Sequence, residues 1–409
     1  MSRDKADKTT KTTAYAQLRH PSWIKRTPGM KRPGSSTESG KDIVSKFEMM
    51  PDQGKSKIPP PFMISYAITS KCNLKCKHCY SDSSEDSDTS KELTNEESKK
   101  VIDQIADWGI QMLIMDGGEP TEREDLPDLV YYATLKGVRT VIGTNATKID
   151  AKLARKLKDA GVMAAQISVD GANSKTHDWF RGEEGSFDAA MAGAKVLREV
   201  GIPFQFGATV RRGTLKEIPR ILDLAVESGA MAAEMFDLVE VKRVKKLVPN
   251  EILTPEERKE IWTWLAKKQE DYPLIIRSPG CPMYPLLLNL LDIKPKHFPY
   301  HTLYRIPYFN RGCAAGYPNG YMTILPDGNV IPCMLLQINI GNVREKTLYD
   351  IWDNSKVCQE VRDRSLLKGE CGKCEHLESC AGCRGRAYEV TGDYLETDPG
   401  CWMREGKLL

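Results

Sequence analysis

The chain has 409 residues, 28% of them charged, with a formal net charge of +3 and twelve cysteines. So small a charge implies no nucleic-acid partner, and no apolar run approaches the length of a membrane span. The cysteines stand in CxxC groups and no secretory apolar segment is present, which argues against an extracellular disulfide scaffold and predicts reduced thiols in a cytoplasmic protein.

The first sixty residues form a compositionally distinct segment. Residues 1–60 hold thirteen Lys and Arg against six Asp and Glu, with prolines and little periodicity. This composition predicts a basic, flexible leader. Its basic excess is either a solubility feature or a docking arm for an acidic partner.

Six short strand-like runs come next, each followed by a polar helical segment. They are Phe62–Thr69, Met112–Gly117, Thr140–Thr144, Ala164–Asp170, Phe204–Val210 and Ala233–Val239. Capping boxes are predicted at Thr94 with Glu97 and at Thr254 with Glu257. The alternation predicts an α/β fold in which residues 61–280 form a partial barrel of six β/α units. In such folds the chemistry collects at the carboxyl ends of the strands.

A triplet of cysteines with the spacing CxxxCxxC follows the first strand. Cys72, Cys76 and Cys79 offer three thiolates, and on a four-iron cluster they leave one iron without a protein ligand. An open iron can chelate a small molecule and pass it an electron. The alternative is a zinc site or buried thiols, but only His78 stands nearby, between two of the cysteines.

The triplet resembles the signature of the radical S-adenosylmethionine (SAM) enzymes, and the similarity extends from about residue 62 to about residue 403. Gly117, Gly118, Glu119 and Pro120 are similar to the GGEP turn of that family. The resemblance implies that this turn holds the amino group of the methionine part of SAM.

Other positions that match the family follow in the same order along the chain. Ser168 and Asp170 resemble the ribose-contacting end of the fourth strand, and Arg181 resembles the arginine on the SAM carboxylate. His78 takes the place of an aromatic residue near the adenine, and Asn145 falls at a further strand end. Together they imply one SAM site at the carboxyl edge of the barrel.

The resemblance also implies the reaction. A low-potential donor such as ferredoxin or flavodoxin supplies an electron, SAM is cleaved to methionine and a 5′-deoxyadenosyl radical, and the radical removes hydrogen from an unactivated carbon. The residues at the strand ends then position SAM and do not act as acids or bases.

A second group of cysteines lies in the C-terminal third. Cys313 and Cys333 flank a turn, Pro326-Asp327-Gly328, between two strand-like runs. This pattern predicts a β-hairpin that brings the two thiols toward each other.

Five more cysteines follow with the spacing CxxCx5CxxCx17C. They are Cys371, Cys374, Cys380, Cys383 and Cys401. Spacing alone allows a zinc ribbon. Because the CxxxCxxC triplet stands upstream, however, residues 313–409 resemble a SPASM domain, which binds auxiliary four-iron clusters. The resemblance implies a reaction in which the substrate is oxidised.

The resemblance implies a ligand set for each of one or two auxiliary clusters. Cys371, Cys374, Cys380 and Cys401 bind one cluster, and Cys313, Cys333 and Cys383 bind the other. The interval between Cys380 and Cys383 is shorter than usual in the family, which leaves Cys383 the least secure ligand. The second cluster has an open iron or takes a fourth ligand from Cys281 or Cys358, which otherwise are buried thiols.

The substrate is suggested by residues 380–401. They resemble the C-terminal end of the radical SAM enzymes of the alternative haem pathway, the group of SAM-dependent haem synthases and didecarboxysirohaem deacetylases. The resemblance implies oxidative modification of tetrapyrrole side chains, with decarboxylation of iron-coproporphyrin III as the closest match. Lys242-Arg243-Val244 departs from the glycine-containing turn expected after the sixth strand.

Segment 281–312 is rich in aromatic and basic residues that suit a flat, acidic ligand. They are Tyr284, Phe298, Tyr300, Tyr304, Tyr308 and Phe309 with Lys294, Lys296, His297, His301, Arg305 and Arg311. The alternative is a linker that packs on the barrel.

Two other functions remain open. One is a maturase of peptides or proteins, although residues 1–60 are too irregular for a winged-helix leader-binding domain, and Met334 stands where sulfatase maturases carry an acidic residue. The other is a non-enzymatic iron–sulfur or zinc protein, which would leave the GGEP turn, Asp170 and Arg181 without a reason to coincide.

Overall fold

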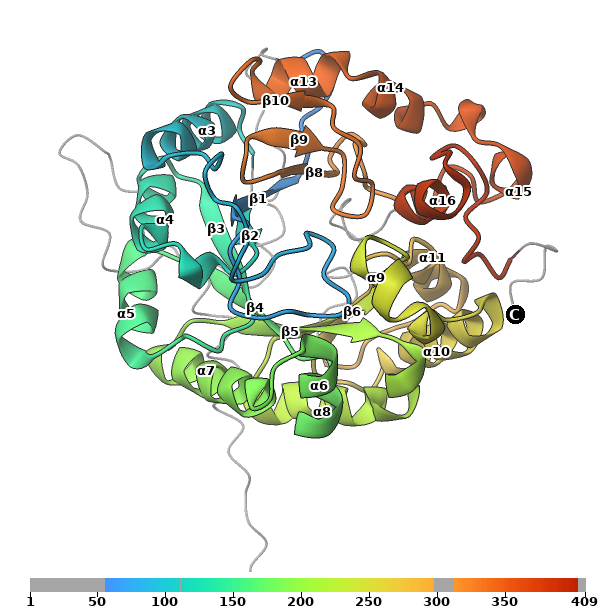
Figure 1. Cartoon of the computed structure of the whole chain (residues 1–409). Coiled ribbons are helices and arrows are strands. Elements are labelled where there is room, and N and C mark those ends of the chain that lie inside the picture. Colours follow the sequence, from blue (N-terminus) through green and yellow to red (C-terminus); the bar gives the residue numbers. More distant parts are fainter. Residues whose placement is uncertain (1–55, 111, 298–311, 404–409) are drawn as a thin grey trace, which may run out of the picture. The chain divides into compact units, whose positions relative to one another are not determined.

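The computed structural model describes residues 56–110, 112–297 and 312–403, and all of these belong to one compact unit. Their strands form a single sheet of ten in the order β10-β9-β8-β1-β2-β3-β4-β5-β6-β7, curled into an open barrel (Figure 1). Strands β1 to β7 run parallel. They are β1 Met63–Thr69, β2 Met112–Gly117, β3 Arg139–Thr144, β4 Ala164–Ser168, β5 Phe204–Val210, β6 Ala232–Asp237 and β7 Ile275–Arg277.

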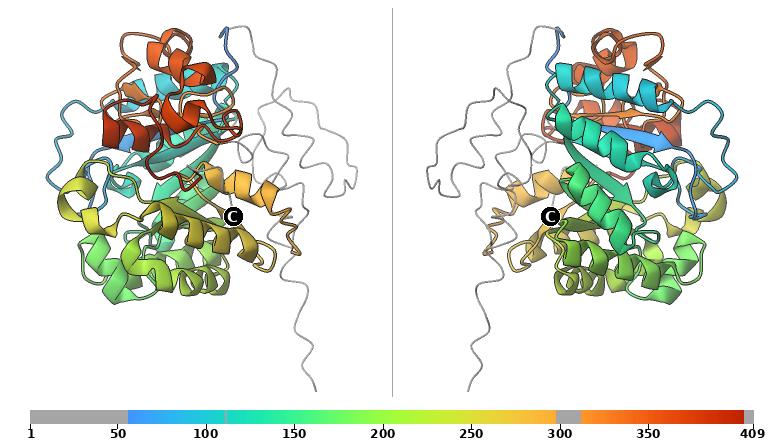
Figure 2. Two further views of the ribbon diagram at one scale, coloured as in Figure 1. Left: turned by 90° about the vertical axis from the view of Figure 1, so that its right-hand side faces the viewer. Right: turned by 90° about the vertical axis from the view of Figure 1, so that its left-hand side faces the viewer.

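Helices cover the outer face of the sheet, and Figure 2 shows α3, α4 and α5 stacked along it in chain order. Those of the barrel are α3 Asn95–Asp107, α4 Leu126–Leu135, α5 Ala151–Ala160, α6 Ser174–Arg181, α7 Ser186–Val200, α8 Ile218–Ser228, α9 Arg243–Leu247, α10 Pro255–Lys268 and α11 Met283–Leu290. All seven residues of β1 are buried, as expected for a central strand that is covered on both faces.

The predicted α/β fold is confirmed, with all six predicted strands in place to within two residues at either end. Both capping boxes are present: the hydroxyls of Thr94 and Thr254 accept from the backbone N–H of Glu97 and Glu257, and each glutamate accepts from the backbone of its threonine. The sequence does not predict β7, because three residues are too few to show a period.

The predicted hairpin is formed by β8 Tyr321–Ile324 and β9 Asn329–Ile331, which pair antiparallel. Gly328 in its turn has φ 84°, a conformation that favours glycine. Strand β8 also pairs in parallel with β1, with Met63 opposite Tyr321, so the hairpin extends the sheet of the barrel. The short strand β10, Gly341–Asn342, pairs with β9.

The rest of the C-terminal region is helical and rich in loops. It contains α13 Leu348–Asn354, α14 Lys356–Arg362, α15 Gly369–Gly372 and α16 Arg384–Thr391. Helix α13 packs on the barrel through Trp352, whose ring lies 6.1 Å from that of Trp108. The barrel and the cysteine-rich region therefore share one sheet and one core.

The predicted basic leader lies outside the described residues as far as residue 55. Its last residues contact α13: the Ser56 hydroxyl donates to Asp353 at 2.6 Å, and the carbonyl of Pro59 accepts from the Trp352 indole at 3.1 Å. Within the described part of the chain, no helix is both long and apolar enough to cross a bilayer.

Segment 281–312 is described in part. Tyr284 is buried and packs edge-on against Trp262, so it belongs to the core. Lys294 pairs with Asp292 at 2.6 Å, and Lys296 pairs with Asp271 at 2.7 Å. The predicted substrate contacts from Phe298 to Arg311 lie outside the described residues.

Candidate active site

The loop that follows β1 carries Cys72, Cys76 and Cys79 and lies at the carboxyl end of the strands, in front of the barrel in Figure 1. Backbone hydrogen bonds fix its path. Cys72 N–H donates to the Ser84 carbonyl at 3.0 Å, and Lys77 N–H donates to the Phe180 carbonyl on α6 at 2.9 Å.

The three sulfurs face one another closely enough to interact. Burial raises the pKa of Cys72 to about 12, and the neighbouring Cys76 and Cys79 act in the same direction. Backbone N–H groups point at two of the sulfurs, from Leu74 to Cys72 at 3.4 Å and from Ser83 to Cys79 at 3.4 Å. Such N–H···S contacts stabilise thiolates that bind a cluster and tune its potential.

The GGEP turn packs directly against the cysteine loop. Gly117 has φ 141°, and a Cβ there would lie 2.4 Å from the Thr69 carbonyl oxygen. A Cβ on Gly118 would lie 2.2 Å from the Lys71 carbonyl oxygen. Only glycine allows the two backbone segments to approach this closely.

Glu119 ties the turn to the end of β3. It is buried, and its carboxylate accepts from the hydroxyl of Thr144 at 2.7 Å, the backbone N–H of Asn145 at 2.7 Å and the hydroxyl of Thr121 at 2.8 Å. Burial raises its pKa, and these donors oppose the shift. The Asn145 side chain in turn donates to Asn73 in the cysteine loop at 2.9 Å.

Asp170, at the end of β4, lies at the centre of a buried charged group. Its carboxylate pairs with Arg181 at 2.6 Å, approaches His78 at 3.5 Å and accepts from the Thr209 backbone at 2.6 Å. Burial alone would raise the pKa of Asp170, but Arg181 and His78 hold it well below its usual range. Arg181 also donates to Cys76 Sγ at 3.8 Å.

His78 is a neutral aromatic ring in this site. Its imidazole stacks on Phe180 with centroids 4.1 Å apart, and burial lowers its pKa to about 3. His78 Nδ1 and Arg181 Nε are buried and have no hydrogen-bond partner. Because three thiols, a stacked ring and two unpartnered nitrogens meet here, the residues fit a four-iron cluster and an adjacent polar ligand.

The structure thus brings the residues of the predicted SAM site together at the carboxyl ends of the strands, and Ser168, the last residue of β4, lies two positions before Asp170. Their individual contacts with SAM stay predictions.

The turn after β6 holds the cysteine loop, a role that the sequence does not predict. Lys242 has φ 35° and ψ −105°, a conformation that glycine favours, so the turn expected there is formed by a lysine. Arg243 next to it donates to the carbonyls of Cys76 at 3.2 Å and Ser83 at 2.8 Å and pairs with Asp82 at 2.5 Å.

The twelve cysteines are all free thiols, and seven of the eight in the C-terminal region fall into two groups. In the first group, burial and the charge of Cys313 raise the pKa of both Cys333 and Cys383. In the second group, besides burial, Cys371 and Cys401 raise the pKa of Cys380, and Cys371 and Cys374 raise the pKa of Cys401. These are the two ligand sets implied by the resemblance, and the assignment stays a prediction.

Burial raises the pKa of Cys333 in the first group to about 12 and that of Cys401 in the second to about 11. Across the described ranges, no three His, Cys, Asp or Glu side chains are close enough together to share a single metal ion. A four-iron cluster needs no such closeness, because its thiolates bind different iron atoms.

The two remaining thiols lie near these groups. Cys281 is buried beside Asp237 and Arg386, and this burial together with the charge of Cys380 raises its pKa. Cys358, in α14, lies under the Cys313 loop, where a Cβ on Gly316 would be 3.0 Å from its sulfur.

The sequence does not predict a polar group that lies between the two cysteine regions. Asp116 in β2 accepts from the Ser65 hydroxyl at 2.7 Å, and burial raises its pKa to about 6. Burial is the largest cause that raises the pKa of Tyr80 and Tyr321. The charges of Asp116 and Cys333 raise both values further. Only the position of Asp116 directly before the GGEP turn hints at this group.

Family models match both parts of the chain. Residues 66–225 match the radical SAM superfamily, and residues 313–384 match an iron–sulfur cluster-binding domain, SPASM. The AdoMet-dependent heme synthase of Methanosarcina barkeri is 37% identical over 85% of this chain and 98% of its own length. The Fe-coproporphyrin III synthase of the same organism is 31% identical over 93% of this chain and 96% of its own length.

Solved structures show the same fold at lower identity. SuiB of Streptococcus suis superposes with a TM-score of 0.65 at 20% identity, over 83% of this chain and 77% of its own. The enzyme anSMEcpe, bound to AdoMet and a peptide, superposes with a TM-score of 0.63 at 21% identity, over 84% of this chain and 94% of its own.

The family uses SAM and a [4Fe-4S] cluster in the barrel, with auxiliary clusters in the SPASM domain. When bound, the barrel cluster supplies the electron that cleaves SAM. The three thiols of the β1 loop would hold this cluster, and the strand ends beside them would hold SAM. The chain belongs to the radical SAM superfamily, among the enzymes that carry a C-terminal SPASM domain.

Proposed function

We propose that this enzyme modifies a tetrapyrrole by oxidative decarboxylation of two propionate side chains of iron-coproporphyrin III to vinyl groups, which yields haem. The observation that carries the proposal is the 37% identity to an AdoMet-dependent heme synthase over 98% of that protein's length. Two further heme synthases are each 32% identical over at least 85% of this chain.

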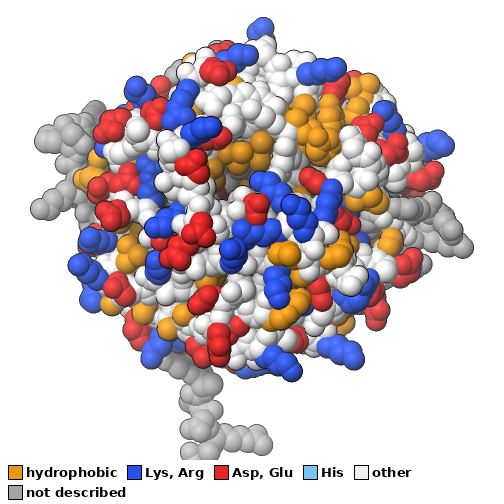
Figure 3. All heavy atoms as spheres, viewed as in Figure 1, with side chains coloured by type: hydrophobic (Ala, Val, Ile, Leu, Met, Phe, Trp, Pro, Cys, Tyr) orange, Lys and Arg blue, Asp and Glu red, His pale blue; other side chains and the backbone are white. Residues whose placement is uncertain are grey.

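The arrangement of the barrel mouth supports this reaction. Asp116, Tyr80 and Tyr321 lie between Cys79 of the barrel loop and Cys333 of the SPASM domain. A substrate held here would face both cysteine groups, so the carbon that loses hydrogen would lie toward the barrel cysteines and the residues that would hold an electron-accepting centre would lie on the other side. On this face, several basic side chains gather near the middle (Figure 3), which suits a ligand with several carboxylates.

We also infer the cellular setting. Twelve free cysteines suit the reducing cytoplasm, where thiols stay available for cluster assembly. A low-potential carrier such as ferredoxin or flavodoxin is the expected electron donor, since the barrel cluster needs an external electron for each SAM that is cleaved.

The test is anaerobic reconstitution with iron and sulfide, followed by incubation with SAM, a reductant and iron-coproporphyrin III. Mass spectrometry is expected to show the loss of two carboxyl groups, one from each of two propionates, together with 5′-deoxyadenosine. Formation of deoxyadenosine with unchanged porphyrin would contradict the proposed substrate and leave the family assignment intact.

A second tetrapyrrole is favoured by the 31% identity to an Fe-coproporphyrin III synthase over 93% of this chain. The same assay with didecarboxysirohaem tests it, and loss of acetate side chains would assign the chain to that earlier step. A peptide substrate has weaker support, since the matching PqqA peptide cyclases are 26–28% identical.

The ligand assignments are tested with two variants. Replacing Cys72, Cys76 and Cys79 with alanine is expected to abolish deoxyadenosine formation while auxiliary iron remains. Replacing Cys371 and Cys374 with alanine is expected to remove about one cluster of iron per chain. Loss of zinc in place of iron from the second variant would contradict the auxiliary cluster.

A further inference from the structure

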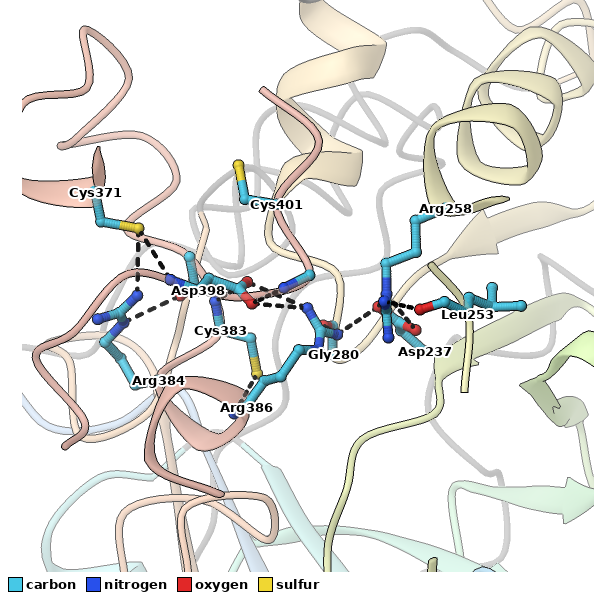
Figure 4. A network of polar contacts seen from close by, with 12 residues as sticks. Asp237, Leu253, Arg258, Gly280, Cys371, Cys383, Arg384, Arg386, Asp398 and Cys401 are labelled. Carbon is cyan, nitrogen blue, oxygen red and sulfur yellow. Dashed lines mark hydrogen bonds and ion pairs between the residues drawn. The ribbon is translucent and has the colours of Figure 1, made fainter. Parts of the chain in front are cut away.

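A chain of buried charges joins the end of β6 to the SPASM cysteines (Figure 4). Asp237 is the last residue of β6, Arg386 lies in α16, and Asp398 lies in the loop before Cys401. All three side chains are buried, as is Arg258 of α10, and each aspartate pairs with at least one arginine. A buried charge is stable only when it is paired and hydrogen-bonded in this way.

Arg386 is the link between the two domains. One end of its guanidinium donates to the Asp237 carboxylate and to the Gly280 carbonyl, the latter at 2.9 Å. Its other end donates to both oxygens of Asp398, at 3.1 and 3.2 Å. A planar guanidinium spans two carboxylates with separate donors in fixed directions, whereas an ammonium presents all of its donors from one atom.

Asp398 in turn forms hydrogen bonds with cysteines of both SPASM groups. Its carboxylate accepts from the Cys383 backbone N–H at 2.7 Å and from the Gly400 N–H at 2.9 Å. Its own N–H donates to Cys371 Sγ at 3.4 Å. Arg384, two residues before Arg386, donates to the same sulfur at 3.6 Å.

We propose that Arg386 is a positioning residue that holds ligands of both auxiliary centres against the barrel and, by its charge, raises their reduction potentials. The proposal rests on the SPASM assignment and on the two ligand groups, and it is independent of the substrate. A positive charge near a cluster favours the reduced state, which carries one more negative charge. One side chain would thus set both the position and the reduction potential of the auxiliary centres.

The test uses protein in which Cys72, Cys76 and Cys79 are replaced by alanine, so that all remaining iron is auxiliary. In this background, Arg386→Gln is expected to bind less iron, and the clusters that remain are expected to have a lower midpoint potential in an EPR-monitored titration. Asp398→Asn is expected to move the midpoint in the opposite direction, because it removes a negative charge. Damage to packing alone would not reverse the sign.

Arg258→Gln is the matched control. Arg258 donates to the same Asp237 carboxylate, at 2.9 and 3.2 Å, and is also buried, but its hydrogen bonds stay within the barrel and include one to the Leu253 carbonyl. It is expected to lower the urea midpoint and leave the auxiliary iron and potential unchanged.

Three outcomes would overturn the proposal: wild-type iron and midpoint in Arg386→Gln, the same direction of shift in Arg386→Gln and Asp398→Asn, or an equal shift in Arg258→Gln. If Arg386→Gln does not fold, Arg386→Lys replaces it. The lysine keeps the charge and loses the bridge, so iron retention is expected to fall while the midpoint stays near its original value. Absence of iron from the parent background would overturn the SPASM ligand assignment instead.

Discussion

At the scale of single residues, the site depends on buried charges that neutralise one another. Asp170 is 1% exposed, pairs with Arg181 at 2.6 Å and is also close to His78. Because the cysteine loop, β4 and α6 meet at this pair, it holds the predicted SAM pocket together before any ligand binds.

Asp170→Asn tests the cost of breaking that pair. It leaves the Arg181 charge buried without its partner, so we expect the free energy of unfolding of the apo-protein to fall by about 3–5 kcal/mol. Urea denaturation followed by circular dichroism measures it. The control is Glu199→Gln on α7, which breaks an exposed pair with Lys195 and is expected to change stability by less than about 0.5 kcal/mol. Equal effects from the two variants would contradict a buried pair.

The raised pKa of Asp116 gives a pH dependence. Its folded pKa is about 6, above the value near 4 of an unfolded aspartate, so the folded state holds this proton more tightly. Its contribution to stability is therefore complete below about pH 4, is lost as the pH rises from about 4 to about 6, and stays lost above that.

Asp116→Asn is expected to remove this dependence. The amide can still accept from Ser65 and carries no charge, so the variant should exceed the parent apo-protein in stability by roughly 1–3 kcal/mol at pH 7 and match it at pH 4. Urea midpoints at the two pH values measure the difference. Asp159→Asn, at an exposed position on α5, is the control and should show no such pattern. A constant difference at both pH values would contradict the explanation.

At the scale of elements, the termini of helices and strands place the functional groups. The GGEP turn, the end of β3 and the end of β4 carry Glu119, Asn145 and Asp170 to one edge of the sheet, and the turn after β6 clamps the cysteine loop through Arg243. That last turn contains strain, because Lys242 occupies a conformation with positive φ.

Lys242→Gly is expected to relieve the strain. Glycine adopts positive φ without steric cost, and its greater freedom in the unfolded chain offsets part of the gain, so we expect stabilisation of about 0.5–1 kcal/mol. Lys242→Ala is the control, since it removes the same side chain and keeps the strain. If both variants changed the urea midpoint equally, the effect would come from the side chain and the prediction would fail.

At the scale of the whole molecule, the barrel and the SPASM domain are one structural unit. Strand β8 pairs with β1, the Leu348 backbone donates to Gln104 of α3 at 2.8 Å, and Arg386 joins α16 to β6. The sheet therefore continues across the domain boundary predicted at residue 313, from β1 to β8.

A chain that ends at residue 297 tests this unity. Removal of β8 exposes the edge of β1, whose seven residues are all buried in the intact protein, and an exposed apolar edge promotes aggregation. We expect the truncated chain to aggregate or to unfold at lower urea, while the full apo-protein shows one transition by circular dichroism and by tryptophan fluorescence. An independently folded truncated barrel with an unchanged midpoint would contradict it.

Much of the fold was predictable because its signals are local. Strand periods, the capping boxes at Thr94 and Thr254 and the turn at Gly328 depend on residues within a few positions of one another. The sequence does not predict β7, because three residues are too few to show a period. It does not predict the contacts of Arg243 with the cysteine loop, because these partners lie more than 150 positions away along the chain.

The sequence by itself determined the α/β fold, the three-cysteine loop, the GGEP turn and the cysteine-rich C-terminal region, since motif spacing and side-chain period are properties of the chain alone. Only the tertiary structure decided that β8 extends the barrel sheet, that Asp116 and two tyrosines lie between the cysteine groups, and that Arg386 bridges Asp237 and Asp398. The physical reason is that burial creates these effects: a shifted pKa or a mandatory ion pair arises only when distant segments exclude water together.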